Sequence, residues 1–517
     1  MNISEAKEQV LYTMEAYSAK DECGNYLLSP EEQRPLFLMG PPGIGKTAIV
    51  KQAAEELGLG LVCYSITHHT RQSALGLPKI VHKSFGEDEY DVSEYTMSEI
   101  ISSVYDCMEQ SGCREGILFL DEVNCASETL TPTMLQFLQF KTFGRHKVPD
   151  GWIVLTAGNP VSYNRSAREF DIVTWDRLKR IDIEPDFAAW KQYAYQRETH
   201  GSIMTYLEAR KENFYKIEET VDGKRFVTAR GWVDLSNIIK IYERKGLPVD
   251  QKLIAQYLQS PDIAEEFAIY YDLYNKYKAD YKLDEILSGH TPEEILSRAK
   301  NAPFDERLSL LGLLLDQVNR DAANVVRKED IVSELLPLLR KVKAGASLAD
   351  ITAEENELFL RYRKMGVLSV DSRNKYEAVL AFLNRHITAR SDFQALKAGF
   401  DALVSELRSC AEAAGAKLTN LFDFVSTAWG DGQEILILVT ELTIGYYASR
   451  FLSRYGCEAY DRHSESLRFY ERNLEIRKKP KHSGSMASLT KRSRPSPRRC
   501  GSIYDDAANI ERRIICQ

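Results

Sequence analysis

The chain has 517 residues, of which 44% are hydrophobic and 27% charged, with a formal net charge of −8. These values are normal for a soluble globular protein and allow about three to four domains. The net acidity argues against a protein that coats DNA, and nine cysteines without a C-x-x-C pair exclude a disulfide framework.

The composition also bears on location. No uninterrupted apolar run approaches the roughly 18 residues that a membrane span needs. The first eight residues carry charges where a signal peptide would be apolar. Free cysteines are typical of a reducing compartment. We therefore expect a cytoplasmic protein without a membrane span.

The first expected element is an amphipathic helix over residues 3–20, because Ile3, Ala6, Val10 and Tyr17 fall on one helical face. A loop over residues 21–34 leads from this helix into a short apolar strand, residues 35–39. A helical run follows at residues 48–57. Strands and helical segments then alternate up to residue 183, the pattern of a parallel sheet covered on both faces.

The loop between that strand and helix matches the phosphate-binding pattern G-x-x-x-x-G-K-[ST]. Its glycines let backbone N–H groups turn toward an anion, and the next helix adds its positive dipole end. Lys46 is expected to reach the β- and γ-phosphates of a nucleoside triphosphate, and the Thr47 hydroxyl to bind Mg²⁺. The residues predicted to bind the nucleotide here are Gly40, Pro41, Pro42, Gly43, Ile44, Gly45, Lys46 and Thr47.

Two later strands end in polar side chains. Residues 117–120 precede Asp121 and Glu122, and residues 152–157 precede Gly158 and Asn159. Ligands of open α/β sheets bind outside the carboxyl ends of the strands. We therefore expect Asp121 near the Mg²⁺ held by Thr47, Glu122 placed to polarise the attacking water, and the Asn159 amide at the same edge.

The series GPPGIGKT, LFLDEVN and LTAGNP, with Asp176-Arg177-Leu178 and Thr228-Ala229-Arg230-Gly231-Trp232, resembles the AAA+ ATPases, and most closely their MoxR-like branch. The resemblance covers about residues 1–247. It implies an α/β fold, the P-loop NTPase αβα sandwich with a parallel sheet and a helical lid. It also implies that Asn159 orients the attacking water, that Arg177 is an arginine finger for a neighbouring subunit, and that Arg230 is the sensor arginine of the lid. Arg180 is a rival finger, and plain surface charges are the alternative for each arginine.

Two stretches fit the resemblance less well. Residues 86–99 are polar and acidic, and a MoxR-like insert near the second helix cannot be aligned with them. Residues 67–71 contain His68 and His69, which are metal ligands elsewhere, but no Cys or carboxylate lies at ligand spacing. A loop that faces a pore or the nucleotide, or a plain surface loop, is the expectation there.

Beyond residue 185 the pattern is helical, with a turn at residues 221–224 and a last helix over residues 232–244 that Gly246 and Pro248 end. Residues 249–462 show apolar helical stripes and no strand signal.

Residues 477–499 contain nine basic and no acidic residues, which predicts a disordered tail, either solvated or touching nucleic acid or anionic lipid. The expected domains are a lead-in over residues 1–34, a nucleotide-binding core over 35–185, a lid over 186–247, an all-α domain over 248–462 and a basic tail over 463–517.

The expected reaction is hydrolysis of ATP to ADP and phosphate, with Mg²⁺ as cofactor. The MoxR-like resemblance implies a homo-oligomeric ring, most often a hexamer, that remodels or matures a partner protein, often one with a von Willebrand factor A domain. Two alternatives stay open: a DNA-handling AAA+ motor, and a nucleotide-gated scaffold with slow hydrolysis.

Overall fold

The computed structural model describes residues 1–465 except residues 69, 87 and 222, so the predicted tail lies almost wholly outside the described residues. The described chain divides into two compact units. The first unit is Met1–Tyr270 with Asp330–Ala402, and the second is Tyr271–Glu329 with the described residues from Leu403 onward. The domain limits expected from the sequence stay a prediction, and the first unit takes up residues 330–402 in addition to the nucleotide-binding core.

A parallel sheet of five strands lies at the centre of the first unit, in the order β2-β5-β8-β1-β9. The strands are β1 (Leu36–Met39), β2 (Gly60–Ser65), β5 (Gly116–Asp121), β8 (Trp152–Gly158) and β9 (Lys179–Asp182). The register pairs Ser65 with Asp121 and Met39 with Gly158, so the carboxyl ends of these strands meet at one edge.

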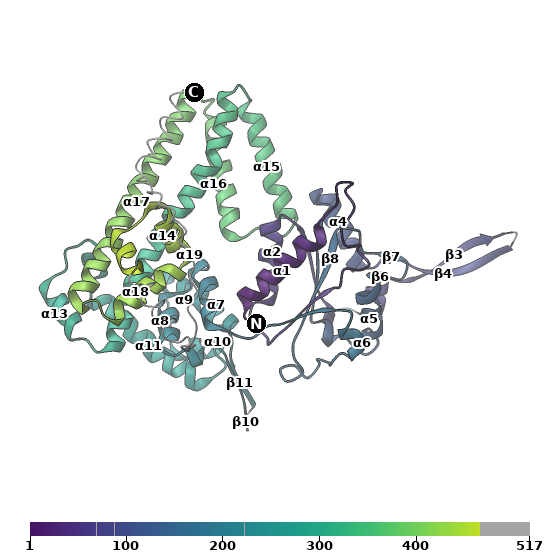
Figure 1. Cartoon of the computed structure of the whole chain (residues 1–517), viewed down its shortest axis with the longest axis horizontal. Helices are drawn as coiled ribbons and strands as arrows, with labels where there is room; N and C mark the ends of the chain where they lie inside the picture. The colour runs from purple at the N-terminus through teal and green to yellow at the C-terminus, as the bar shows by residue number, and fades with distance from the viewer. Residues whose placement is uncertain (69, 87, 222, 466–517) are drawn as a thin grey trace, which may run out of the picture. The chain divides into compact units, whose positions relative to one another are not determined.

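The sheet is covered on both faces. Ile117 and Phe119 pack in one apolar cluster with α1 (Ile3–Ser18) and α2 (Lys46–Leu57). Leu118 and Leu120, the alternate residues of the same strand, pack in a second cluster with α4 (Glu99–Ser111) and α5 (Thr131–Phe140). Strands buried on both faces are expected to be continuously apolar, as β5 is. The predicted αβα P-loop fold is therefore confirmed (Figure 1).

Three antiparallel hairpins were not predicted. The first, β3 (Pro78–Phe85) with β4 (Asp88–Tyr95), runs into the acidic stretch and projects from the core (Figure 1). The second, β10 (Lys216–Thr220) with β11 (Gly223–Val227), interrupts the segment after residue 185, so the expectation of helix with a turn was wrong over these residues. Most of the β3–β4 side chains are exposed on both faces, so the hairpin lacks the apolar alternation that marks a half-buried strand. A short third pair is β6 (Thr142–Phe143) with β7 (His146–Lys147).

Helices continue the first unit beyond the sheet. Trp232 is fully buried against Tyr206 and Phe267. Its helix begins at Ala229 and ends at Lys245, and Gly246, with φ 65°, caps it. These helices are α7 (Phe187–Gln196), α8 (Gly201–Ala209), α9 (Ala229–Lys245), α10 (Gln251–Tyr257) and the start of α11 (Pro261–Asp280). The short helical turns of the unit are η1 (Ile66–His68), α3 (Arg71–Leu75), η2 (Val123–Cys125), α6 (Ile172–Trp175) and η3 (Lys211–Asn213).

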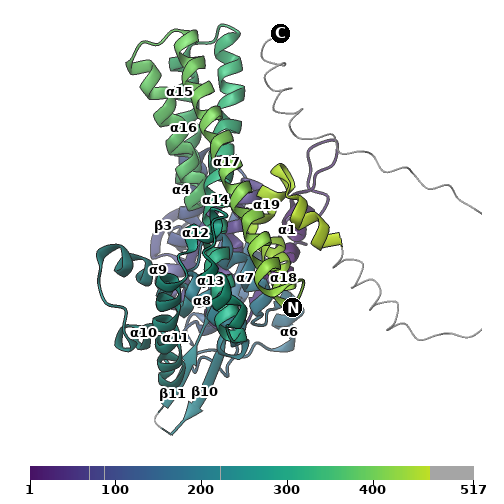
Figure 2. The same cartoon turned by 90° about the vertical axis from the view of Figure 1, so that its left-hand side faces the viewer.

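A helical hairpin from much later in the chain returns to the sheet. It consists of α15 (Leu348–Lys364) and α16 (Val370–Thr388), which lie side by side (Figures 1 and 2). Met365, in the turn between them, is 1% exposed and belongs to the apolar cluster of α1 and α2. Its carbonyl oxygen accepts a hydrogen bond from the Leu61 amide at 3.3 Å. Because β2 pairs only with β5 in the sheet, this turn covers the free edge of β2.

The second unit is helical in its described residues. Arg307 forms an ion pair with Glu434 at 3.2 Å, and the Trp429 indole donates to the Ala299 carbonyl at 2.8 Å. Its helices are α12 (Leu283–Leu287), α13 (Glu293–Asn301), α18 (Gln433–Ile444), α19 (Tyr446–Tyr455) and parts of α14 (Phe304–Lys343) and α17 (Phe393–Trp429). The predicted helical C-terminal region is thus confirmed. Among the described helices, no single helix is long and apolar enough to cross a bilayer. Taken together, α18 and α19 would be long and apolar enough, but the pair is bent by 90°.

Candidate nucleotide-binding site

The phosphate loop joins β1 to α2 in the predicted way. Gly43 and Gly45 adopt φ values of 76° and 102°, which residues with a Cβ atom rarely adopt. At Gly40 a Cβ atom would lie 2.8 Å from the Ile183 carbonyl oxygen. Gly45 precedes α2 without a side-chain cap, so the first amides of the helix stay available to an anion.

Lys46 begins α2, and its side chain is buried. Its Nζ donates to the carbonyl oxygens of Gly40 at 2.7 Å and Pro41 at 2.9 Å. It also donates to the Asn159 Oδ1 at 2.8 Å, which brings together two residues predicted from separate segments. Burial lowers the pKa of Lys46 to about 8; the nearby Asp121 opposes this shift and the nearby Arg230 adds to it.

Thr47 and Asp121 also meet. The Thr47 hydroxyl donates to the Asp121 Oδ2 at 3.1 Å. A hydroxyl and a carboxylate are hard oxygen ligands of the kind that Mg²⁺ takes, together with waters and substrate phosphates. The donor set therefore fits the predicted Mg²⁺ site.

The histidine pair gives no evidence for a second metal site. Among the described residues no group of three or more His, Cys, Asp or Glu side chains could hold a metal. His69 and the side chains of His68 and Arg71 are not among the described parts of the chain.

Glu122 is held in an unusual conformation. It has φ 56° and ψ 35°, in the left-handed region, which costs a residue with a Cβ roughly 1–2 kcal/mol. Its Oε2 accepts hydrogen bonds from the hydroxyls of Ser65 at 3.2 Å and Thr67 at 3.1 Å. The backbone turn and the two hydroxyls aim this carboxylate. Ser65 and Thr67 were not predicted to contact Glu122, although Ser65 ends the strand next to β5.

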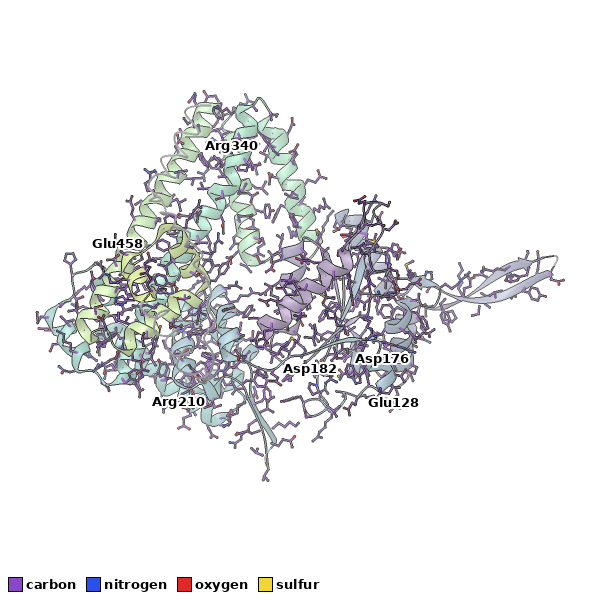
Figure 3. The ribbon with its side chains drawn as sticks, in the orientation of Figure 1. Glu128, Asp176, Asp182, Arg210, Arg340 and Glu458 are labelled. Carbon is purple, nitrogen blue, oxygen red and sulfur yellow. The ribbon has the colours of Figure 1, made fainter. Side chains whose placement is uncertain are left out.

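The two finger candidates differ in their partners. Arg177 is exposed, and its Nη1 donates to the Gln139 Oε1 at 2.5 Å. Arg180 lies on the edge strand β9, where it forms an ion pair with Asp182 at 2.8 Å. Figure 3 labels Asp182 in the first unit. The guanidinium carbon of Arg180 also lies 4.5 Å from the centre of the Trp175 ring. Arg180 is therefore held within its own chain by a charge and a ring, whereas Arg177 donates to a neutral amide and has the Asp171 carboxylate nearby.

The segment expected to form the lid contacts the phosphate loop at two consecutive carbonyl groups. The Arg230 amide donates to the Gly43 oxygen at 3.2 Å. The Tyr215 hydroxyl donates to the Pro42 oxygen at 2.8 Å, and burial raises the pKa of Tyr215. Tyr215 was not predicted, because nothing in the local sequence marks a tyrosine at the start of a hairpin as a partner of a loop 173 residues earlier.

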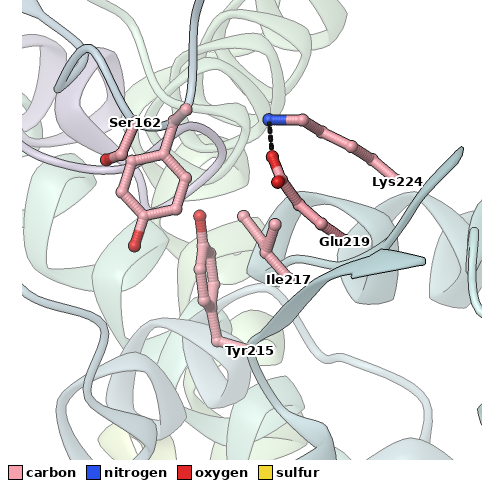
Figure 4. A pocket seen from close by; sticks show the side chains of 6 residues that line it. Ser162, Tyr215, Ile217, Glu219 and Lys224 are labelled. Atoms are coloured by element: carbon pink, nitrogen blue, oxygen red, sulfur yellow. Dashed lines mark ion pairs between the residues drawn. The ribbon is translucent and has the colours of Figure 1, made fainter. Parts of the chain in front are cut away.

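A pocket of about 550 Å³ opens between the β10–β11 hairpin and the loop that follows Asn159 (Figure 4). An ion pair of 2.8 Å between Glu219 and Lys224 crosses one wall. The lining residues are Ser162, Tyr163, Tyr215, Ile217, Glu219 and Lys224. None of these is a predicted site residue, and the pocket adjoins the phosphate loop through the Tyr215 hydrogen bond to Pro42.

Comparison with known proteins adds one match. Residues 35–178 match the family model of an AAA domain of the dynein-related subfamily. The matched span contains the phosphate loop, Asp121, Glu122, Asn159 and Arg177, and it ends before Arg230. No curated protein matches the chain. The match supports an ATP-driven AAA+ protein with a P-loop nucleotide-binding core.

Proposed function

We propose that this protein is a MoxR-like AAA+ ATPase that hydrolyses ATP to ADP and phosphate and couples the reaction to remodelling or maturation of a partner protein. The observation that carries the proposal is a convergence at one sheet edge. Lys46 contacts Asn159 at 2.8 Å and Thr47 contacts Asp121 at 3.1 Å, and these residues come from three separate segments. Such a set of groups matches the parts that P-loop enzymes use for phosphoryl transfer.

Each residue has a distinct proposed role. Lys46 and the amides at the start of α2 bind the β- and γ-phosphates. Thr47 and Asp121 would hold Mg²⁺, which supplies neutralising charge when it is bound. The Glu122 carboxylate polarises the attacking water, and the Asn159 amide orients that water at the γ-phosphate. The Arg230 side chain, close enough to Lys46 to lower its pKa, responds to the γ-phosphate from the lid.

Arg177 is proposed to act on the γ-phosphate of a neighbouring subunit in a homo-oligomeric, most often hexameric, ring. Both arginines are exposed, and the neutral hydrogen-bond partner of Arg177 supports this role over Arg180, which is paired with Asp182. Arginine fingers contribute about 10³–10⁵ to the rate in other phosphoryl-transfer systems. A closed ring gives every subunit a neighbour.

The test of catalysis compares two variants. Lys46→Ala should abolish ATP binding, because Lys46 contacts phosphate charge in the ground state. Glu122→Gln should retain binding and lose turnover, because Glu122 acts on the water only during the reaction. Affinity measured by calorimetry and phosphate release measured by a coupled assay separate the two roles. Equal loss of affinity in both variants would contradict them.

The test of the ring mixes two inactive variants, Arg177→Ala and Lys46→Ala. Partial activity should return, since a Lys46→Ala subunit still offers Arg177 to a neighbour that binds ATP. A dead mixture in which mixed oligomers are seen by mass spectrometry would exclude a role for Arg177 in trans.

The partner is tested by stimulation of turnover. Acceleration by a protein with a von Willebrand factor A domain is the expected result. Acceleration by DNA would favour a DNA-handling motor, and turnover that no partner changes, with assembly switched by a non-hydrolysable ATP analogue, would favour a scaffold.

A further inference from the structure

Asn124 lies two residues after Glu122, in the short helical turn η2, and its side chain is almost completely buried. Its Nδ2 donates to the backbone carbonyl oxygen of Asn159 at 2.8 Å. Asn159 in turn contacts Lys46 through its own side chain. A single buried amide therefore connects the turn that follows the catalytic carboxylate to the residue that faces the phosphate-binding lysine.

The same residue also contacts the far end of the loop that begins at Asn159. The Arg168 amide donates to the Asn124 backbone oxygen at 2.8 Å. The Asn124 Nδ2 lies 3.5 Å from the Arg168 carbonyl oxygen. Arg168 is held from its side chain as well, by an ion pair with Glu128 at 2.8 Å. Asn124 therefore fixes both ends of the loop over residues 159–168.

The chemistry of the contact requires an amide. The two nearest partners of Nδ2 are carbonyl oxygens, which accept and cannot donate. The Cys125 thiol lies 3.9 Å from Oδ1, on the acceptor side of the group. The fit is also close, because a Cβ atom at Gly158 would lie 2.4 Å from the Asn124 Oδ1. A carboxylate of the same size would place a negative charge against the partially negative carbonyl oxygen of Asn159.

We propose that Asn124 is a positioning residue for ATP hydrolysis: its amide fixes the backbone of Asn159, so that the Asn159 side chain faces Lys46 and the γ-phosphate. The inference rests on the proposed ATPase function and assigns a role to a residue that touches neither nucleotide nor metal. Loss of the contact changes the response to the γ-phosphate and leaves binding of ADP in place.

The experiment uses Asn124→Asp in the full chain, with Asn420→Asp as the matched control. Asn420 also donates from Nδ2 to one backbone carbonyl, that of Leu287, at 2.8 Å, but it lies in the second unit. The kcat and KM for ATP are measured together with the affinities for ADP and for a non-hydrolysable ATP analogue. Asn124→Asp should lower kcat at least tenfold and change ADP affinity less than threefold, while Asn420→Asp should retain wild-type kcat.

Two further variants distinguish a positioning role of Asn124 from a merely structural one. Adding Asn124→Asp to Asn159→Ala should cause little further loss of kcat, because both changes remove the same function. Asn124→Ala, which removes the donor without adding a charge, should give the same fall in kcat with unchanged ADP affinity. If Asn124→Asp does not fold, as judged by circular dichroism, Asn124→Ala carries the test with the same expectations.

Three results would overturn the inference: kcat values of Asn124→Asp and Asn420→Asp that are equal, full additivity with Asn159→Ala, or parallel losses of ADP and analogue affinity. These results presuppose an active wild type. A wild-type protein that neither binds nor hydrolyses ATP would refute the proposed function itself, whatever the variants do.

Discussion

The affinity for ATP should fall as the pH rises through about 8, because the buried Lys46 loses its charge there. Burial lowers the pKa of this ammonium group from its usual value near 10.5 to about 8. With that pKa, Lys46 is charged in roughly nine tenths of the free protein at pH 7 and in roughly one tenth at pH 9. Bound phosphate favours the charged form, so binding takes up protons in this range and high pH opposes it.

The size of the effect follows from these populations. If only the ammonium form binds, the affinity falls about tenfold between pH 7 and pH 9, which is about 1.4 kcal/mol. Isothermal titration calorimetry at pH 7, 8 and 9, in two buffers of different ionisation enthalpy, measures both the dissociation constant and the proton uptake. Uptake should be close to half a proton per ATP at pH 8.

A second buried lysine provides the control. Burial also lowers the pKa of Lys141 to about 8, and its Nζ donates to the Pro30 carbonyl oxygen rather than to the phosphate loop. The Lys141→Met variant should retain the fall in affinity. An affinity that is constant within twofold from pH 7 to 9, or a fall that disappears in Lys141→Met, would refute the assignment to Lys46.

Three further predictions concern the segment proposed to form the lid and the helical hairpin of α15 and α16. Arg230→Ala should lower turnover and leave the melting temperature without nucleotide unchanged, because the side chain is exposed at the start of α9; a drop of several degrees would make it a structural residue. Tyr215→Phe should weaken ATP binding about fivefold, the value of one hydrogen bond of about 1 kcal/mol to the phosphate loop, and unchanged affinity by calorimetry would show that this bond does not shape the loop. Met365→Ala should lower the free energy of unfolding by about 2–5 kcal/mol in urea titrations, since its side chain is 1% exposed, and a loss below about 1 kcal/mol would contradict its place in the core.

The core of the fold could be predicted because its signals are local. The strand β5 is a run of buried apolar residues, and α2 follows the glycine-rich loop at once. The hairpins β3–β4 and β10–β11 could not be predicted in the same way. Their side chains lie largely in water on both faces, as Ile80 and Tyr90 do, so no alternation of polar and apolar residues marks them.

The residues of the candidate site also differ in whether local sequence could predict them. Lys46, Thr47 and Asp121 belong to motifs in which residue type and spacing already state the chemistry, and the structure brings them together. Asn124 and Tyr215 act through contacts with residues 35 and 173 positions away. Such contacts are set by tertiary packing. The motif that contains Asp121 does extend to Asn124, and that was the one available signal for it.

The turn between α15 and α16 has a consequence for synthesis of the chain on the ribosome. Ser369 donates its amide to Glu55 on α2, 314 residues earlier, and Met365 covers the edge of β2. At about 5–20 residues per second, translation takes roughly 15–60 s to deliver these late residues after α2 has emerged. During that interval the nascent sheet has an open edge and an unfilled apolar site, which are features that chaperones and neighbouring chains recognise. The nucleotide-binding core is therefore one of the first parts of this protein to be made and one of the last to be completed.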